Sequence, residues 1–338
     1  MKLVTDGFGP AAYGDCMLAA YAARFDGDDP VGALEVGERP EPEAREGWVV
    51  VEVRASALNH HDLWSLKGVG LREQNLPMIL GCDAAGVDPD GNEVVVHAVV
   101  SDPGWKGDET LDPKRSLLSE RYQGTLAQKV AVPAGNVVPK PAGLSFEQAA
   151  CLPTAWLTAY RMLFTQSDLK PGDTVLVQGA GGGVATALIT LARHAGIRVW
   201  ATSRDEAKRA RAVEIGAHEA FESGARLPER VDAVMETVGQ ATWSHSLKSL
   251  KQGGTVVISG ATSGQAPPSA ELNRIFFLQL RVQGSTMGTR TELAELVQFM
   301  ANAGIEPHID SVLPLADARE GFAKMHEGDV FGKIVFTV

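Results

Sequence analysis

The residues best suited to binding chemistry form a glycine-rich turn near the middle of the chain, Gly179-Ala180-Gly181-Gly182-Gly183. Glycine adopts backbone conformations that strain other residues, and it has no side chain to keep a ligand away from backbone N–H groups. A helix that begins at such a turn adds an N-terminus that attracts anions. The turn therefore predicts a site for a pyrophosphate.

The flanking sequence supplies the elements that such a turn needs. The apolar run 175–177 is typical of a parallel strand buried on both faces. Val184 opens an apolar helical pattern, and the apolar segment 197–201 indicates a second strand. Ala185 stands at the position of the last glycine in the dinucleotide-binding glycine motif, where alanine is also tolerated. Strand, glycine turn, helix and strand within about 30 residues form the dinucleotide-binding unit. The alternative is a purely structural turn.

The end of the second strand indicates which dinucleotide binds. An acidic residue about 20 residues beyond the turn would accept the ribose 2′-OH of NAD. Ser203 stands there instead, Arg204 follows it, and Lys208 comes one helical turn later. Cationic side chains bind a phosphate on the ribose, and the carboxylate that would accept the 2′-OH of NAD is missing at this position. The sequence therefore predicts NADP(H) over NAD(H). The alternative is a solvated helix face, in which Asp205 and Glu206 are neighbours of these cations.

The bulk properties describe an ordinary protein of two domains. The chain has 338 residues, a formal net charge of −11 and three cysteines. The negative charge argues against binding nucleic acid or acidic membranes, and the odd, sparse cysteines suggest free thiols in a reducing, cytoplasmic setting. No apolar run is long enough to span a membrane. Residues 1–16 lack the apolar core of a signal peptide and are interpreted as an extension.

The order of the remaining segments predicts the architecture. From residue 17 to about 138 the sequence is rich in strand patterns, whereas strands and helices alternate after it. A capping pattern at Ser145 opens a helix that we expect to continue through 149–164. The last strand, 332–338, has no helix after it and is expected to return to the first domain. We predict an α/β protein with a β-rich domain, 1–143 and 306–338, and a doubly wound parallel-sheet domain, 144–305.

Six motifs in this order resemble those of the medium-chain dehydrogenase/reductase superfamily. They are Ala57–Trp64, Gly81–Gly86, Leu157–Tyr160, the glycine turn, Ser259–Thr262 and Phe331–Lys333. The resemblance implies a GroES-like domain beside a Rossmann domain, with the active site in the cleft between them. It also implies a homodimer in which the last Rossmann strand, here around 280–284, pairs across the two-fold axis.

The resemblance also bears on metal chemistry. Zinc enzymes of the family carry ligands at positions occupied here by Asn59, Cys82 and a residue near Thr154, and only Cys82 keeps a ligand type. Catalytic zinc normally needs three protein ligands, and 101–124 has no cysteine for a structural zinc. The chain thus resembles the zinc-independent branch of the family, which is similar to quinone oxidoreductases. Within that branch it resembles sequences described as zinc-binding-dehydrogenase-like, and no metal is expected. A rearranged zinc site is the alternative, built from His60, His61, Asp62, Cys82, Asp83 and His97.

The activity implied by the resemblance is hydride transfer from NADPH to a small electrophile, a quinone or an α,β-unsaturated carbonyl compound. Both acceptors delocalise the arriving charge, so hydrogen-bond donors can take the place of a Lewis acid. Asn59 is a candidate donor to the carbonyl or a residue that holds its loop, and His61 is a candidate proton donor or merely an exposed histidine. Asp62 is expected to organise the backbone or contact His61. Trp64 replaces a family tyrosine and is expected to stack on a flat substrate.

Further cofactor contacts are expected at family positions and at the carboxyl edge of the sheet, where ligands bind. They are Thr158 near the nicotinamide, Thr237, Val238, Gly239, Ser259, Gly260, Ala261, Ser285 and Thr286 after strands, and Lys333 from the returning tail. Each loop serine or threonine is alternatively a turn former. A dinucleotide-binding protein without turnover is the competing hypothesis from another functional class.

Overall fold

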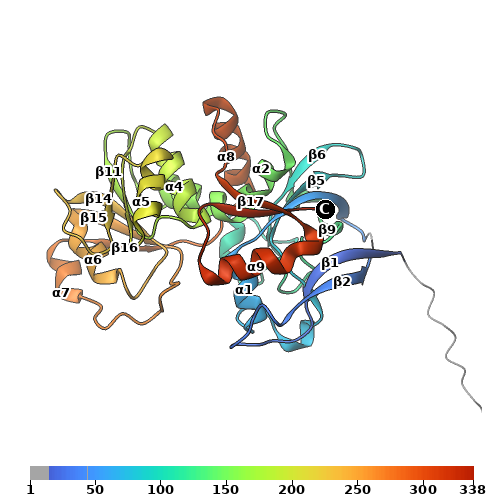
Figure 1. Cartoon of the computed structure of the whole chain (residues 1–338). Coiled ribbons are helices and arrows are strands. Elements are labelled where there is room, and N and C mark those ends of the chain that lie inside the picture. The colour runs from blue at the N-terminus through green and yellow to red at the C-terminus, as the bar shows by residue number, and fades with distance from the viewer. Residues whose placement is uncertain (1–14, 44) are drawn as a thin grey trace, which may run out of the picture.

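The computed structural model describes residues 15–43 and 45–338. The predicted extension 1–16 lies outside the described residues except for its last two, and Cys16 begins the first strand. Figure 1 shows a β-rich half and an α/β half side by side, with β17 (Ile309–Pro314) and α9 (Ala318–Glu327) between them. Within the described ranges, no helix combines the length and apolar composition needed to cross a bilayer.

The β-rich half is organised around a seven-stranded sheet in the order β10-β6-β5-β3-β18-β17, with β9 also paired to β3. The long strand β3 has three partners, because its first half pairs with β9 and its second half pairs with β5 and β18. Smaller sheets of order β2-β1-β4 and β7-β8 complete this half. The strands are β1 (Cys16–Ala22), β2 (Leu34–Pro40), β3 (Trp48–Ala57), β4 (Met78–Ile79), β5 (Asp83–Val87), β6 (Glu93–Val96), β7 (Val99–Val100), β8 (Ser116–Leu117), β9 (Lys129–Pro133), β10 (Val137–Pro139) and β18 (Lys333–Thr337), and the helices are α1 (His60–Leu66), η1 (Glu73–Asn75), η2 (Glu109–Leu111), η3 (Ala134–Asn136) and η6 (Leu315–Asp317).

The α/β half contains a parallel sheet of order β13-β12-β11-β14-β15-β16. Val175 and Val177 of β11 pack into one core, and Leu176 packs into another on the opposite face, so the sheet is buried on both sides. These features confirm the predicted α/β fold class. The elements are β11 (Thr174–Val177), α4 (Gly183–His194), β12 (Arg198–Ser203), α5 (Glu206–Glu214), β13 (Glu219–Glu222), β14 (Val231–Glu236), α6 (Trp243–Ser249), β15 (Leu250–Ile258), α7 (Leu272–Phe277), β16 (Arg281–Gly284) and α8 (Arg290–Ala303).

The strand order reverses between β11 and β14, because the chain runs outward to β13 and then crosses back. Ligands of doubly wound sheets bind at this switch point, beyond the carboxyl ends of the strands. The turns after β11, β12, β14, β15 and β16 all lie at that edge. The fold therefore gathers most of the predicted cofactor residues on one side of the sheet.

The segment before β11 differs from the continuous α-helix that the sequence predicts. Ser145 forms the expected capping box with Gln148. However, the segment is then divided into α2 (Phe146–Ala150), η4 (Leu152–Trp156), α3 (Leu157–Tyr160) and η5 (Arg161–Thr165), of which η4 and η5 are π-helical. Pro153 has no N–H to donate, which helps to explain why the regular pattern breaks at η4.

The tail returns to the β-rich half, as the sequence predicts. Strand β18 pairs antiparallel with β3, where Val335 lies opposite Ala57. Just before β18, the N–H of Gly332 donates to the carbonyl oxygen of Gly181, 2.8 Å away. The tail therefore contacts the glycine turn and the end of β3 together. The proposed domain boundaries at 143/144 and 305/306 stay a prediction.

Candidate functional site

The glycine turn follows β11 and provides an open anion site. Gly179 has a φ of +75°, and a Cβ added there would lie 2.6 Å from Val238 Cγ2. Gly181 has a φ of +130°, so both positions require glycine. Gly182 is the N-cap of the 12-residue helix α4, and no side chain caps this helix. A Cβ added at Gly182 would have no atom within 4 Å, so the space beside it is open. The turn thus fits the pyrophosphate of a dinucleotide.

Two further turns lie against this one at the switch point. The carboxylate of Glu236, fully buried at the end of β14, accepts the N–H groups of Val238 and Gly239 at 2.8 and 2.9 Å. Gly239 has a φ of +89° and approaches Ala261, which belongs to the predicted turn 259–261 after β15. Sequence reasoning missed Glu236, although a polar residue at the end of a buried strand was a usable signal.

The predicted ribose end follows β12. Ser203 is buried and Arg204 is exposed. The Lys208 side chain extends over Gly181, so that a Cβ added at Gly181 would lie 2.9 Å from Lys208 Cδ. The Lys208 ammonium donates to the carbonyl oxygen of Gly328 at 2.7 Å. The structure therefore places Lys208 beside the glycine turn and leaves the Arg204 guanidinium in solvent.

The other predicted cofactor residues are more dispersed. Thr158 is buried in α3. Ser285 follows β16, and its hydroxyl is buried with no hydrogen-bond partner among the described residues. The next residue, Thr286, is exposed and lines a cavity between the two halves. The unpartnered hydroxyl of Ser285 is the one most in need of a ligand, since a buried hydroxyl without a hydrogen bond costs free energy.

On the opposite side of the cleft, the loop before α1 is held by Asp62. The backbone N–H groups of Asn59 and Gly81 donate to its two carboxylate oxygens, each at 2.9 Å. Asp62 is completely buried. Its carboxylate thus fixes two backbone segments.

Lys333 lies at the centre of a buried ionic cluster. Its ammonium donates to Asn59 Oδ1 at 2.6 Å, to the Leu58 carbonyl oxygen at 2.8 Å and to Asp83 Oδ2 at 3.0 Å. Burial raises the pKa of Asp83, and the Lys333 charge is the largest influence opposing that rise. The aliphatic stem of Lys333 passes Gly183, where its Cδ would lie 2.8 Å from an added Cβ.

This cluster changes the interpretation of two predicted residues. The Lys333 ammonium is bonded to Asp83, Asn59 and Leu58, and its predicted contact with the cofactor stays a prediction. The amide of Asn59 donates to Asp83 Oδ2 at 2.9 Å while its oxygen accepts from Lys333. Asn59 is therefore engaged within the protein at both ends, which is the loop-holding alternative. Sequence reasoning did not pair Asp83 with Lys333.

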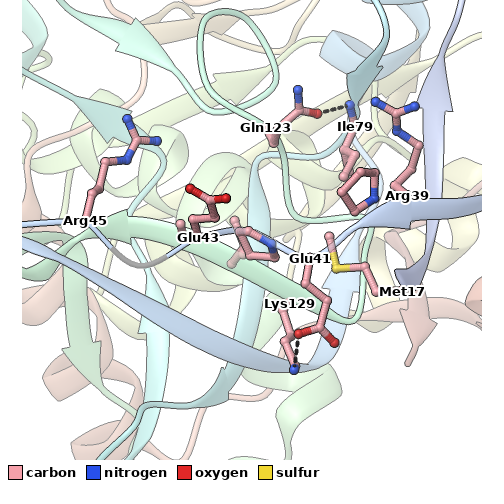
Figure 2. A pocket seen from close by; sticks show the side chains of 12 residues that line it. Met17, Arg39, Glu41, Glu43, Arg45, Ile79, Gln123 and Lys129 are labelled. Atoms are coloured by element: carbon pink, nitrogen blue, oxygen red, sulfur yellow. Dashed lines mark hydrogen bonds and ion pairs between the residues drawn. The ribbon is translucent and has the colours of Figure 1, made fainter. Parts of the chain in front are cut away.

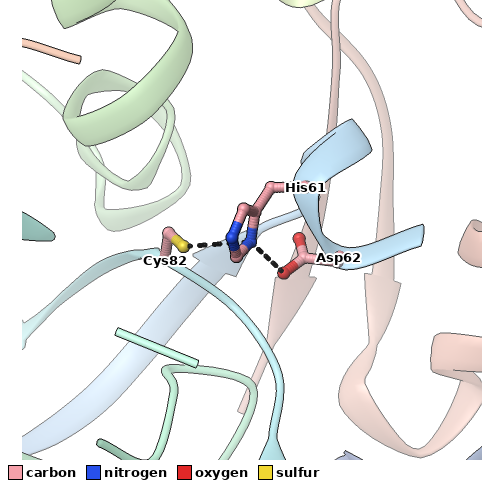
Figure 3. Close-up of side chains that lie close together, drawn as sticks. All are labelled: His61, Asp62 and Cys82. Carbon is pink, nitrogen blue, oxygen red and sulfur yellow. Dashed lines mark hydrogen bonds and ion pairs between the residues drawn. The ribbon is translucent and has the colours of Figure 1, made fainter. Parts of the chain in front are cut away.

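His61 lies between two other polar side chains (Figure 3 shows its Cys82 side). Its Nδ1 is 3.6 Å from Cys82 Sγ, and its Nε2 is 3.2 Å from Glu120 Oε1. Burial opposes the imidazolium, but Cys82, Asp62 and Glu120 outweigh it and raise the pKa of His61 well above its ordinary value. Because a carboxylate oxygen accepts, the 3.2 Å contact with Glu120 assigns an N–H to Nε2 of His61. Glu120 was not predicted, because it lies 59 residues away in sequence.

The same cluster was tested as a metal site. Single ligand atoms of His61, Asp62 and Cys82 lie within 4.8 Å of one another. However, both Asp62 oxygens accept backbone N–H groups, and the Cys82 thiol donates to the Leu118 carbonyl oxygen at 3.2 Å. Burial raises the pKa of Cys82 despite the nearby His61. These side chains thus already make bonds within the protein, and the absence of a metal stays a prediction.

Two cavities differ in their relation to this site. The larger, about 500 Å³, lies beside β1, β2 and β9 and contains none of the predicted site residues. Figure 2 shows that its lining includes an ion pair between Lys129 and Glu41, and Gln123, which accepts the backbone N–H of Ile79. The smaller, about 360 Å³, is lined by Glu120 and Thr286 from opposite halves of the chain. The smaller cavity is the one that belongs to the site.

A glycine turn at the switch point of a doubly wound sheet, beside a β-rich half, is the arrangement of a two-domain nucleotide-binding protein, and the comparisons with known proteins identify the class as oxidoreductases. Residues 45–142 match the family model described as "Alcohol dehydrogenase GroES-like domain", and residues 183–302 match the one described as "Zinc-binding dehydrogenase". The chain belongs to the medium-chain dehydrogenase/reductase superfamily, as the sequence motifs predict.

Individual relatives agree with this assignment over nearly the whole chain. A solved structure titled as an NAD-dependent alcohol dehydrogenase is 34% identical, with a TM-score of 0.88, covering 95% of this chain and 100% of that chain. The crotonyl-CoA carboxylase/reductase of Cereibacter sphaeroides is 28% identical, covering 88% of this chain and 81% of that protein. The quinone oxidoreductase of Lama guanicoe is 27% identical, covering 95% and 98%.

Proposed function

We propose that the protein is an NADPH-dependent reductase that transfers a hydride to a quinone or an α,β-unsaturated carbonyl compound without a metal. The observation that carries this proposal is the open, uncapped N-terminus of α4 at Gly182, which fits a pyrophosphate at the switch point of the sheet. His61 on the facing domain, hydrogen-bonded to Glu120, would supply the second component of a reduction, a proton.

The chain's own residues favour a phosphorylated cofactor. The backbone of 181–183 would hold the pyrophosphate, and Arg204 and Lys208 would pair with the ribose phosphate, since no carboxylate stands at the end of β12. Lys208 would exchange its bond to the Gly328 carbonyl oxygen for the phosphate. The 34% identical relative is titled as NAD-dependent, so cofactor preference is a primary readout of the test.

When bound, the reduced nicotinamide supplies the hydride. The protein residues do the rest: Lys333 neutralises Asp83 and fixes Asn59, which keeps the loop before α1 in place. His61 holds the proton that the reduced substrate requires. Trp64, on the same helix and 37% exposed, offers an apolar ring to a flat acceptor.

The substrate class follows from the charge that develops during reduction. Quinones and conjugated carbonyls spread this charge over several atoms, so protein hydrogen bonds and a proton donor suffice. Relatives named crotonyl-CoA carboxylase/reductase and quinone oxidoreductase are consistent with such acceptors. A panel of quinones, enones and simple ketones with NADPH and NADH, followed by nicotinamide absorbance, tests the proposal. Cofactor binding without oxidation by any acceptor would support the non-catalytic alternative instead.

We also propose that the protein is a homodimer in the reducing cytoplasm. Strand β16 ends the parallel sheet with an unpaired edge, and Val282 on it is 44% exposed. Beside it, α7 exposes Leu272, Phe276 and Phe277 by 60–71%. An open edge next to an apolar patch favours pairing with a second copy. Sedimentation of the wild type and of Phe277→Glu should give a dimer and a weakened dimer.

A further inference from the structure

The Glu120 carboxylate is held by the protein on one side and directed at His61 on the other. Its Oε2 accepts the backbone N–H of Leu117 at 3.1 Å, and its Oε1 lies 3.2 Å from His61 Nε2. The preceding residue, Ser119, has a φ of 67°, an uncommon value for a residue other than glycine. The chain therefore makes a tight bend immediately before this carboxylate, which fixes its direction.

Glu120 also faces the interdomain cavity of about 360 Å³, whereas His61 does not line it. The Glu120 side chain is 27% exposed and that of His61 is 18% exposed. The cavity walls come from both halves, since Leu117 lies beside Glu120 and Thr286 and Met287 follow β16. A substrate in this cavity meets the carboxylate before it meets the imidazole.

The charges around the pair decide where the proton resides. Asp62 from α1 and Cys82 from the segment before β5 face the imidazole, while Arg115 acts on Glu120. Burial opposes the charged carboxylate, but the bond from His61 and the Leu117 N–H outweigh it and lower the pKa of Glu120. Since an ionised carboxylate has no proton to donate, the 3.2 Å contact is a hydrogen bond from the Nε2–H of His61 to Glu120 Oε1, with the proton on the ring.

We propose that Glu120 is a catalytic residue that carries the proton of His61 to the substrate in the interdomain cavity; this inference rests on the proposed reductase function. The substrate gains a hydride at its electrophilic carbon, and its π electrons move to the carbonyl oxygen. The N–H bond at His61 Nε2 breaks, an O–H bond at Glu120 Oε1 forms and breaks in turn, and the proton ends on the substrate. Two electrons pass from the nicotinamide to the substrate, and solvent reprotonates His61.

The first test is Glu120→Gln, which keeps the size and a hydrogen bond to His61 but cannot carry a proton. We expect kcat to fall by about 100-fold, in the range of general acid–base effects, with an increased solvent isotope effect and an unchanged Kd for NADPH. Glu52→Gln, on an exposed side chain of β3, is the matched control and should retain wild-type kcat. Wild-type kcat and isotope effect in Glu120→Gln would overturn the inference.

A second variant separates loss of the carboxylate from loss of structure. Glu120→Ala leaves room beside His61, and added formate should restore a measurable part of kcat. Lack of rescue in a folded variant that binds NADPH would count against proton carriage by Glu120. If the wild type reduces none of the acceptors, both the proposed function and this inference are wrong. If the wild type is active and the Glu120 variants are equally active, only this inference is wrong.

Discussion

Replacing Lys333 with methionine should destabilise the protein strongly. The ammonium is 2% exposed and Asp83 is completely buried, so the variant leaves a carboxylate in the interior without its counter-charge. Removal of one partner from a buried ion pair typically costs about 3–5 kcal/mol. For a domain of this kind, such a loss lowers the melting temperature by roughly 6–20 °C, because 1 kcal/mol corresponds to about 2–4 °C.

The pH dependence of this variant has a definite sign. Burial already raises the pKa of Asp83, and without Lys333 the pKa must rise further because the main opposing charge is gone. A carboxyl with a raised pKa in the folded state is stabilising when protonated and loses that contribution as the pH rises through the folded pKa. The difference in stability between wild type and Lys333→Met should therefore shrink as the pH falls from neutral toward the acid range.

Thermal unfolding followed by tryptophan fluorescence measures this effect, with two further variants for comparison. The double variant Lys333→Met/Asp83→Asn removes the buried charge and should recover much of the lost stability. Lys251→Met breaks an ion pair with Asp232 whose side chains are 47% and 27% exposed, and should cost less than about 1 kcal/mol. A Lys333→Met protein as stable as the wild type, or a loss unaffected by Asp83→Asn, would refute the reasoning.

Three other predictions concern the cofactor and metal. Gly182→Ala should leave the melting temperature nearly unchanged, but fluorescence titration should show weaker NADPH binding, since the added Cβ enters the open space of the turn. Gly179→Ala should instead lower the free energy of unfolding by about 1–2 kcal/mol or more, because the φ of Gly179 is +75° and Val238 occupies the space that the Cβ needs. Arg204→Glu should lower the ratio of kcat/KM for NADPH to that for NADH at least tenfold by repelling the ribose phosphate, and an unchanged ratio would contradict the assignment. Elemental analysis should find substoichiometric zinc, and a chelator should leave activity intact; one tightly bound zinc per chain would contradict the metal-free mechanism.

The sequence alone determined the features that depend on neighbouring residues. The glycine turn, the apolar run at 175–177 and the helix after it follow from local backbone freedom and hydrophobic period, and all appear as predicted. The cap at Ser145 is equally local. The two-domain α/β fold could also be predicted, because the order of these strands and helices and the six motifs are compatible with few architectures.

The tertiary structure decided which side chains from distant parts of the sequence meet. Lys333 and Asp83 are 250 residues apart, and only the pairing of β18 with β3 brings the ammonium beside Asn59. Glu120 reaches His61 through a bend at Ser119 that no periodic pattern signals. Partners of this kind depend on how distant segments pack, because a hydrogen bond forms over about 3 Å of space whatever the separation along the chain. The sequence therefore predicts where a dinucleotide would bind, and the packing of distant strands decided which charged groups meet in the β-rich half.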